Sequence, residues 1–174
     1  MSVDEELHRH AFAALQARRA AADEGSGTRP VPASRIVAYA RRGDAMADLA
    51  LERALRAEPG LQRLYRRALA GVAQASSIRA AAASGTQVTH RRIGAHRLEI
   101  VTEADDMPWL VLRLAEGAAP VTMIELLAPD GTARRLALGA PIDGVIQLPL
   151  DPAFPELAGI AGLIGDPGSE IHLL

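Results

Sequence analysis

The hydrophobic pattern of this 174-residue chain changes its period near residues 81–87, and this change constrains the fold more than any motif. Before it, apolar residues recur at the spacing of an amphipathic helix. After it, they alternate with polar residues, as in a half-buried strand. The segment between them, AAASGTQ, interrupts both periods. The pattern therefore predicts an α+β protein in which helices precede a β domain.

The first 33 residues are predicted to form a helix and a linker. Ser2 to Glu5 has the form of a capping box, so we expect an N-terminal helix over residues 1–22. Residues 23–33 contain Gly and Pro close together and are read as a linker. The chain begins with acidic residues and no apolar run, which argues against a signal peptide.

Residues 34–84 are predicted to form a helical domain. Ser34 and Asp44 are each expected to cap a helix, and Pro59 is expected to end the second one. The helix after Pro59 has one apolar stripe at i, i+3, i+4, i+7 and i+11. The members of this stripe are Leu61, Leu64, Tyr65, Ala68 and Val72.

Residues 85–174 are predicted to form a small antiparallel β-sandwich of about seven strands. The alternating segments are QVTHRRIG, HRLEIVTE, PWLVLRLAE, VTMIELLAP, ARRLALG, GVIQLPLD and EIHLL. Turn signals separate them, and Asp130-Gly131 is the strongest hairpin signal. Trp109 is the only tryptophan. It stands on a central strand of a predicted hairpin, and its side chain is expected to lie in the core.

The charge is distributed unevenly along the chain. Residues 1–84 hold 13 Arg and 9 acids, whereas residues 85–174 hold 6 Arg and 12 acids. Residues 59–98 contain seven arginines and no acid. Such a run predicts either an anionic partner, nucleic acid or an acidic protein, or a solvated face. The aromatic content of 3% argues against nucleic acid, because binding of single strands relies on stacking.

No motif predicts catalysis or a metal site. The chain has no cysteine, and its five histidines do not occur at metal-binding spacings. The segment 103–106, which contains three acids, is interpreted as a hairpin turn rather than a calcium site. The longest apolar stretch, residues 157–164, is far shorter than the roughly 20 residues that cross a bilayer. We therefore expect no enzyme, no cofactor, no metal and no membrane partner, in a cytoplasmic chain.

Residues 34–72 resemble the helical domain of bacterial anti-sigma factors. In that family a short helix with a Tyr leads into a Gly-acid turn, a longer helix with a central acid and a late Leu follows, and a Pro breaks the chain. The matching residues here are Tyr39, Gly43, Asp44, Glu52, Leu55 and Pro59. Zinc-binding members carry His-x-x-x-Cys-x-x-Cys around this break, where Ala54, Glu58 and Leu61 stand here. The resemblance therefore implies a zinc-free member, with Leu61 packing between the helices in place of the metal.

The resemblance implies a regulatory protein-protein interaction factor that sequesters a sigma factor by covering its polymerase-binding surface. The partner would be a sigma factor or another acidic protein surface. The candidate partner-binding residues are Tyr39, Leu55, Leu61, Arg63, Leu64, Tyr65, Arg66, Arg67 and Val72. The apolar members of this set fit equally well as internal core. An alternative stays open, in which the β-sandwich is a binding or scaffold module and the helices are its adaptor arm or form a homo-oligomer.

Overall fold

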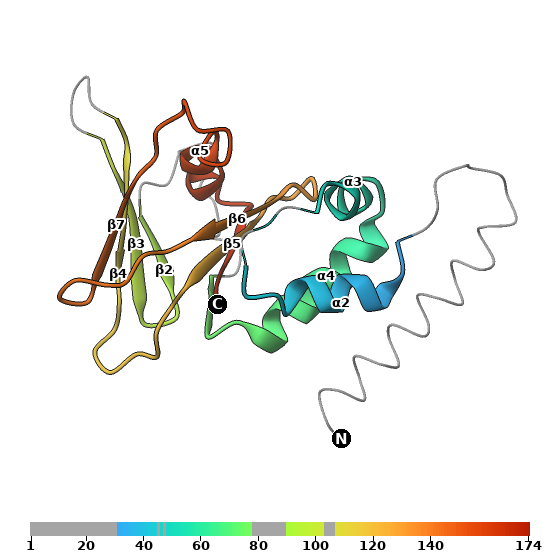
Figure 1. Ribbon diagram of the computed structural model, residues 1–174, viewed down its shortest axis with the longest axis horizontal. Coiled ribbons are helices and arrows are strands. Elements are labelled where there is room, and N and C mark those ends of the chain that lie inside the picture. The colour runs from blue at the N-terminus through green and yellow to red at the C-terminus, as the bar shows by residue number, and fades with distance from the viewer. Residues whose placement is uncertain (1–30, 45, 47, 78–89, 103–106) are drawn as a thin grey trace, which may run out of the picture. The chain divides into compact units, whose positions relative to one another are not determined.

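The protein is an α+β chain in which helices precede two antiparallel sheets, as the computed structural model shows (Figure 1). The structure describes residues 31–44, 46, 48–77, 90–102 and 107–174. The chain divides into two compact units. The helical unit comprises Met1–Arg42 and Asp48–Val72, and the sandwich unit comprises Gly43–Ala47 and Ala73–Leu174. The helix predicted over residues 1–22 and most of the linker lie outside the described residues.

The described part of the helical unit contains three helices: α2 (Ala33–Ala40), α3 (Leu49–Ala57) and α4 (Pro59–Val72). Helices α2 and α3 both pack against α4. The rings of Tyr39 on α2 and Tyr65 on α4 lie 5.9 Å apart between centroids, tilted by 36°. Such aromatic pairs stabilise a core beyond the area that they bury. Each helix presents one apolar stripe, so mutual burial of these stripes holds the unit together.

The predicted break at Pro59 is observed, and it is short. Glu58 is the single residue between α3 and α4, and its backbone is extended (φ −126°, ψ 100°). This conformation is the one expected before proline, whose ring crowds the preceding residue. Pro59 is then the first residue of α4, where its missing N–H costs no helical hydrogen bond.

The helix starts differ from the predicted ones. Ser34 lies inside α2, whose N-cap is Pro32 with no side-chain bond. Helix α3 is capped by Asp48, which accepts a hydrogen bond from the Leu51 N–H at 3.1 Å. Asp44 accepts instead from the Met46 N–H at 3.1 Å and so forms a local turn. Both aspartates precede the apolar residues of α3. Only Asp48 stands three residues before Leu51, whose backbone N–H has no partner within the helix, so only Asp48 can cap α3.

The sandwich unit has two four-stranded antiparallel sheets among the described residues. Sheet A has the order β1-β8-β5-β6, and sheet B has the order β2-β3-β4-β7. The strands of sheet A are β1 (Ala75–Ser77), β5 (Met123–Leu127), β6 (Ala133–Ala137) and β8 (Glu170–Leu173). The strands of sheet B are β2 (His90–Ile93), β3 (His96–Val101), β4 (Trp109–Arg113) and β7 (Val145–Pro149). The short helix α5 (Ile160–Gly165) precedes β8.

The two sheets pack face to face around one apolar core. Sheet A contributes buried residues from its inner face, among them Ile124, Leu126, Leu136, Ile171 and Leu173. Sheet B contributes Ile93, Leu98, Leu110, Leu112 and Ile146. The members on each strand lie two residues apart, as the pleat of a strand requires. The predicted β-sandwich is therefore confirmed.

Strand β1 was missed by the sequence prediction. The seven predicted segments contain β2 to β8, whereas residues 75–77 fall inside the range assigned to the helical domain. Their sequence, ASS, has no apolar alternation. The strand exists because it pairs with β8, with Ala75 opposite Leu173 and Ser77 opposite Ile171. Sheet A thus begins before the predicted boundary, through a pairing between distant parts of the chain.

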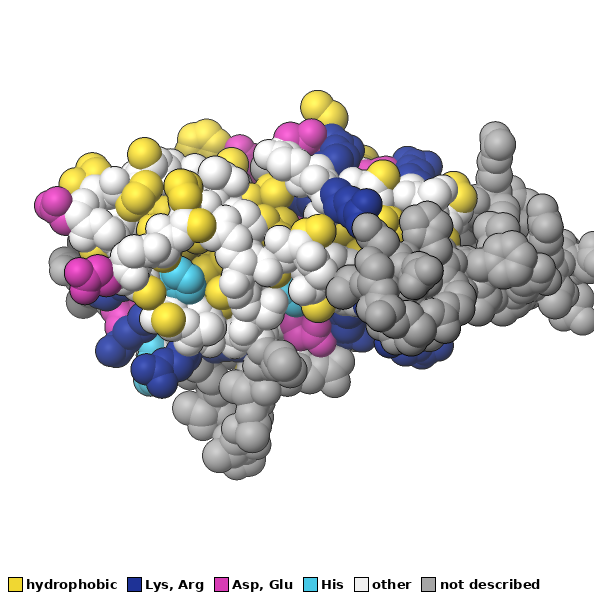
Figure 2. Space-filling model, turned by 90° about the horizontal axis from the view of Figure 1, so that it is seen from below, with side chains coloured by type: hydrophobic (Ala, Val, Ile, Leu, Met, Phe, Trp, Pro, Cys, Tyr) yellow, Lys and Arg dark blue, Asp and Glu magenta, His cyan; other side chains and the backbone are white. Residues whose placement is uncertain are grey.

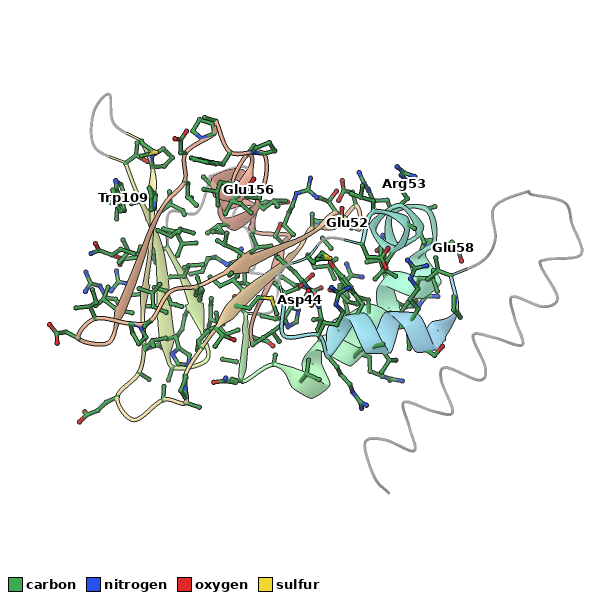
Figure 3. The ribbon with its side chains drawn as sticks, viewed as in Figure 1. Asp44, Glu52, Arg53, Glu58, Trp109 and Glu156 are labelled. Atoms are coloured by element: carbon green, nitrogen blue, oxygen red, sulfur yellow. The ribbon has the colours of Figure 1, made fainter. Side chains whose placement is uncertain are left out.

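The prediction that Trp109 lies in the core is wrong. The register places Leu110 and Leu112 in the core, so Trp109 and Val111 lie on the opposite face of β4. Trp109 is 41% exposed. Figure 3 shows it on the side of sheet B that faces away from sheet A. Its expected place on a central hairpin strand predicts the interior, whereas the alternation along β4 decides which face it takes.

Candidate functional site

The apolar candidates for partner binding lie in the interior of the helical unit. The buried members are Tyr39, Leu55, Leu61, Leu64 and Tyr65. Val72, the last residue of α4, is half-buried. The structure thus brings these residues together as core. A partner could reach the buried ones only if the helices separated, which would expose the whole apolar stripe.

The arginine candidates on α4 are not equivalent. Arg63 and Arg67 are exposed and lie one helical turn apart on the same side of α4. Arg66 is half-buried, and its Nε is buried. Of these three arginines, only Arg63 and Arg67 are therefore exposed.

Exposed arginines also occur on the other helices. Helix α3 carries Leu49, Arg53 and Arg56 at i, i+4 and i+7, so all three share one exposed side. Figure 3 shows Arg53 projecting away from this helix. Arg41 is exposed at the end of α2. Figure 2 shows arginine side chains at the surface of the helical part of the chain.

The acids of the helical unit do not balance this charge. Its described residues hold eight arginines and three acids, a net charge of +5. Glu52 is buried, and Asp48 is held by Arg35, with N–O distances of 2.7–2.9 Å. Burial disfavours ionisation of Asp48, but the Leu51 N–H and the Arg35 guanidinium outweigh it and keep the pKa below its usual value. The solvent-facing charge of the unit is therefore basic.

A polar row crosses sheet A from β1 to β6. The register places Ser76 opposite His172, His172 opposite Glu125, and Glu125 opposite Arg135. The Ser76 Oγ lies 2.8 Å from the His172 Nδ1, and Glu125 forms a buried ion pair with Arg135. The His172 Nε2 lies 3.8 Å from the Glu170 Oε2. The Ser76–His172 contact joins β1 to β8, and the Glu125–Arg135 ion pair joins β5 to β6. Arg135 also donates to the Asp44 carbonyl at 3.4 Å.

Sequence reasoning did not find this row. Its four members stand at positions 76, 125, 135 and 172, and only the strand order of sheet A makes them neighbours. The alternation within β5 and β8 sets only the face of the sheet on which Glu125 and His172 lie. It gives no sign of which residues would meet them there, since pairing partners depend on the topology.

Arg91 forms hydrogen bonds inside the sandwich unit. It is buried on β2 and donates to the carbonyls of Ser169 at 2.7 Å and Asp166 at 3.0 Å. Weaker bonds at 3.4 Å reach the Ile164 carbonyl and the Ser77 hydroxyl. Burial lowers the pKa of the Arg91 guanidinium, and the charge of Asp166 opposes that change. Arg91 therefore links β2 to the segment between α5 and β8.

In the part of the chain that the structure describes, no group of three or more His, Asp or Glu could hold a metal ion. Over the same residues, the helices are all too short or too polar to cross a membrane.

Comparison of the chain with protein-family models, with curated proteins and with solved structures gave no match in any of the three.

Proposed function

We propose that this chain is a regulatory binding protein whose helical unit binds an acidic protein surface. The observation that carries the proposal is the solvent-facing charge of this unit, with exposed arginines on α3 and α4 and a net charge of +5 over its described residues. The resemblance of residues 34–72 to anti-sigma factors suggests a sigma factor as the partner. Binding would then sequester that factor from the polymerase.

The proposed contact is charged, with one apolar anchor. Leu49 is 60% exposed and shares one side of α3 with Arg53 and Arg56. Apolar anchors supply much of the affinity of an interface, and surrounding charges speed association and select the partner. The apolar stripe of α4 stays inside, so the contact needs no separation of the helices. Leu61 is buried there, as the resemblance requires of a residue that replaces zinc.

The test uses sigma factors encoded next to this gene in its host, purified and titrated against the full chain. We expect binding that weakens steeply as salt rises, because exposed charges are screened within about 8 Å at physiological salt. The variant Arg53→Glu/Arg63→Glu/Arg67→Glu should bind about tenfold more weakly or worse, mainly through slower association. The control Ala119→Glu/Ala137→Glu/Ala140→Glu adds acidic side chains at three exposed positions of the sandwich unit and should bind normally.

Two outcomes contradict this function. The first is that the wild-type chain binds none of these sigma factors. The second is that the triple arginine variant binds as tightly as the sandwich-unit control, which would mean that the exposed arginines of α3 and α4 are only solvated.

A second candidate function, a β-sandwich binding module, is favoured by the exposed outer face of sheet B. Trp109 and Val101 are each 41% exposed there and lie directly opposite each other on neighbouring strands. Under this function Arg113→Glu or Trp109→Ala would abolish partner binding, and the triple helical variant would not.

A further inference from the structure

The outer face of sheet B carries three arginines in one row. The register places Arg92 on β2 opposite Arg97 on β3, and Arg97 opposite Arg113 on β4. All three are exposed. Neighbouring strands lie about 4.8 Å apart, so the backbone positions of the three arginines span about 10 Å across the sheet. Figure 2 shows arginine side chains gathered over the strands of sheet B, at the left of the view.

Such a row opposes the stability of the sheet. Like charges directly opposite each other on neighbouring strands repel. Glu99 offsets part of this repulsion, since its carboxylate lies 2.5 Å from the Arg97 Nε. Among the described residues, no carboxylate forms an ion pair with Arg92 or Arg113. The guanidinium groups of these two arginines are therefore free to bind carboxylates or phosphates from another molecule.

The other end of the same face is apolar. Val101 lies opposite Trp109, and Trp109 lies opposite Pro149. Met107, two residues before Trp109, is 37% exposed. Arg113 stands four positions after Trp109 along β4, which corresponds to about 13 Å of extended chain. The face thus has a cationic end and an aromatic end at a fixed separation.

We propose that this face binds an acidic segment of a partner protein. Aspartate or glutamate side chains of the segment would meet the arginine row, and an apolar side chain about 13 Å away would pack on Trp109. This surface belongs to the sandwich unit, so the inference stands apart from the function proposed for the helices.

The charge pattern favours a peptide over a nucleic acid. The sandwich unit as a whole holds 7 arginines and 13 acids, a net charge of −6. A phosphate backbone is charged along its whole length, so its charges would meet no basic side chain at the apolar Trp109 end, and the net charge of the unit would repel it. A peptide can carry its charges at one end only.

The test uses Trp109 as its own reporter, because the chain has one tryptophan. The probe is a Trp-free extended peptide with two glutamates and, four residues after the second, one leucine. We expect a saturable shift of Trp109 emission to shorter wavelength, as the leucine removes water from the indole. Binding should weaken with salt. A peptide with glutamine in place of glutamate, and one with the leucine next to the glutamates, should bind about tenfold more weakly or worse.

Matched variants locate the site. Arg113→Glu should lose about tenfold or more in affinity for the probe peptide. Arg53→Glu, an equal change on α3, should retain it. Arg113 is exposed, and its replacement relieves repulsion in the row, so the variant should fold; an unchanged circular dichroism spectrum checks this.

Three results would overturn the proposal. They are no change in Trp109 emission at millimolar probe, equal binding by Arg113→Glu and wild type, and binding of oligothymidylate at this face as tightly as of the peptide. The last result would assign the surface to single-stranded nucleic acid.

Discussion

Replacing Arg91 with methionine should destabilise the sandwich unit strongly. Methionine has a similar length and fills much of the same space, but it has no hydrogen-bond donor. The change therefore removes the bonds of Arg91 to Ser169 and Asp166 while keeping the packing. A buried acceptor left without its donor costs about 1–3 kcal/mol.

The two short bonds, at 2.7 and 3.0 Å, decide the magnitude. Bonds to a charged group contribute about 1.5–3 kcal/mol each, and the two contacts at 3.4 Å add little. Methionine recovers part of the loss, because burying its thioether requires no desolvation of a charge. The free energy of unfolding of the sandwich unit should therefore fall by about 3–5 kcal/mol.

Trp109 lies in the sandwich unit, so its fluorescence during urea unfolding reports on that unit, whereas circular dichroism reports on both. A loss of about 3 kcal/mol should lower the melting temperature of a unit of about 100 residues by roughly 12 °C or more. Arg92→Met, at the exposed neighbouring position of β2, is the control and should change stability by less than about 0.5 kcal/mol. Equal stability of the two variants would refute the structural role assigned to Arg91.

Two further predictions concern the helical unit. Leu61→Ala should lower its free energy of unfolding by about 2–5 kcal/mol in urea titrations, because the residue is 2% exposed, whereas Leu49→Ala at an exposed position should cost less than about 0.5 kcal/mol. Asp48→Ala should cost about 0.5–2 kcal/mol at pH 7, whereas Asp44→Ala, at the position first predicted as the cap, should cost less. Because folding lowers the pKa of Asp48 below 3.8, its carboxylate stabilises the unit above that pH and loses this effect as pH falls through the lowered pKa. The difference between Asp48→Ala and wild type should therefore shrink in unfolding curves recorded at decreasing pH, and a constant difference would contradict this reasoning.

The parts of the fold that depend on local pattern could be predicted from the sequence. The break at Pro59 follows from the geometry of proline, and the β5–β6 hairpin follows from Asp130 and Gly131, whose φ of 86° suits glycine. The missed features depend on pairing between distant segments. Strand β1 has no pattern of its own and exists through β8. Trp109 is exposed because its neighbours on β4 face the core.

The arginine run of residues 59–98 shows why the candidate sites needed the structure. The sequence suggests one basic surface, yet the arginines of this run lie in three different environments. Arg63 and Arg67 are exposed on α4, Arg91 is buried and bonded to carbonyls, and Arg97 lies in the row on sheet B. Charge counts along the chain cannot separate these roles, because the face of each residue depends on the helical or strand period at its position. Binding is therefore to be sought on two separate surfaces, with the buried arginine assigned to stability.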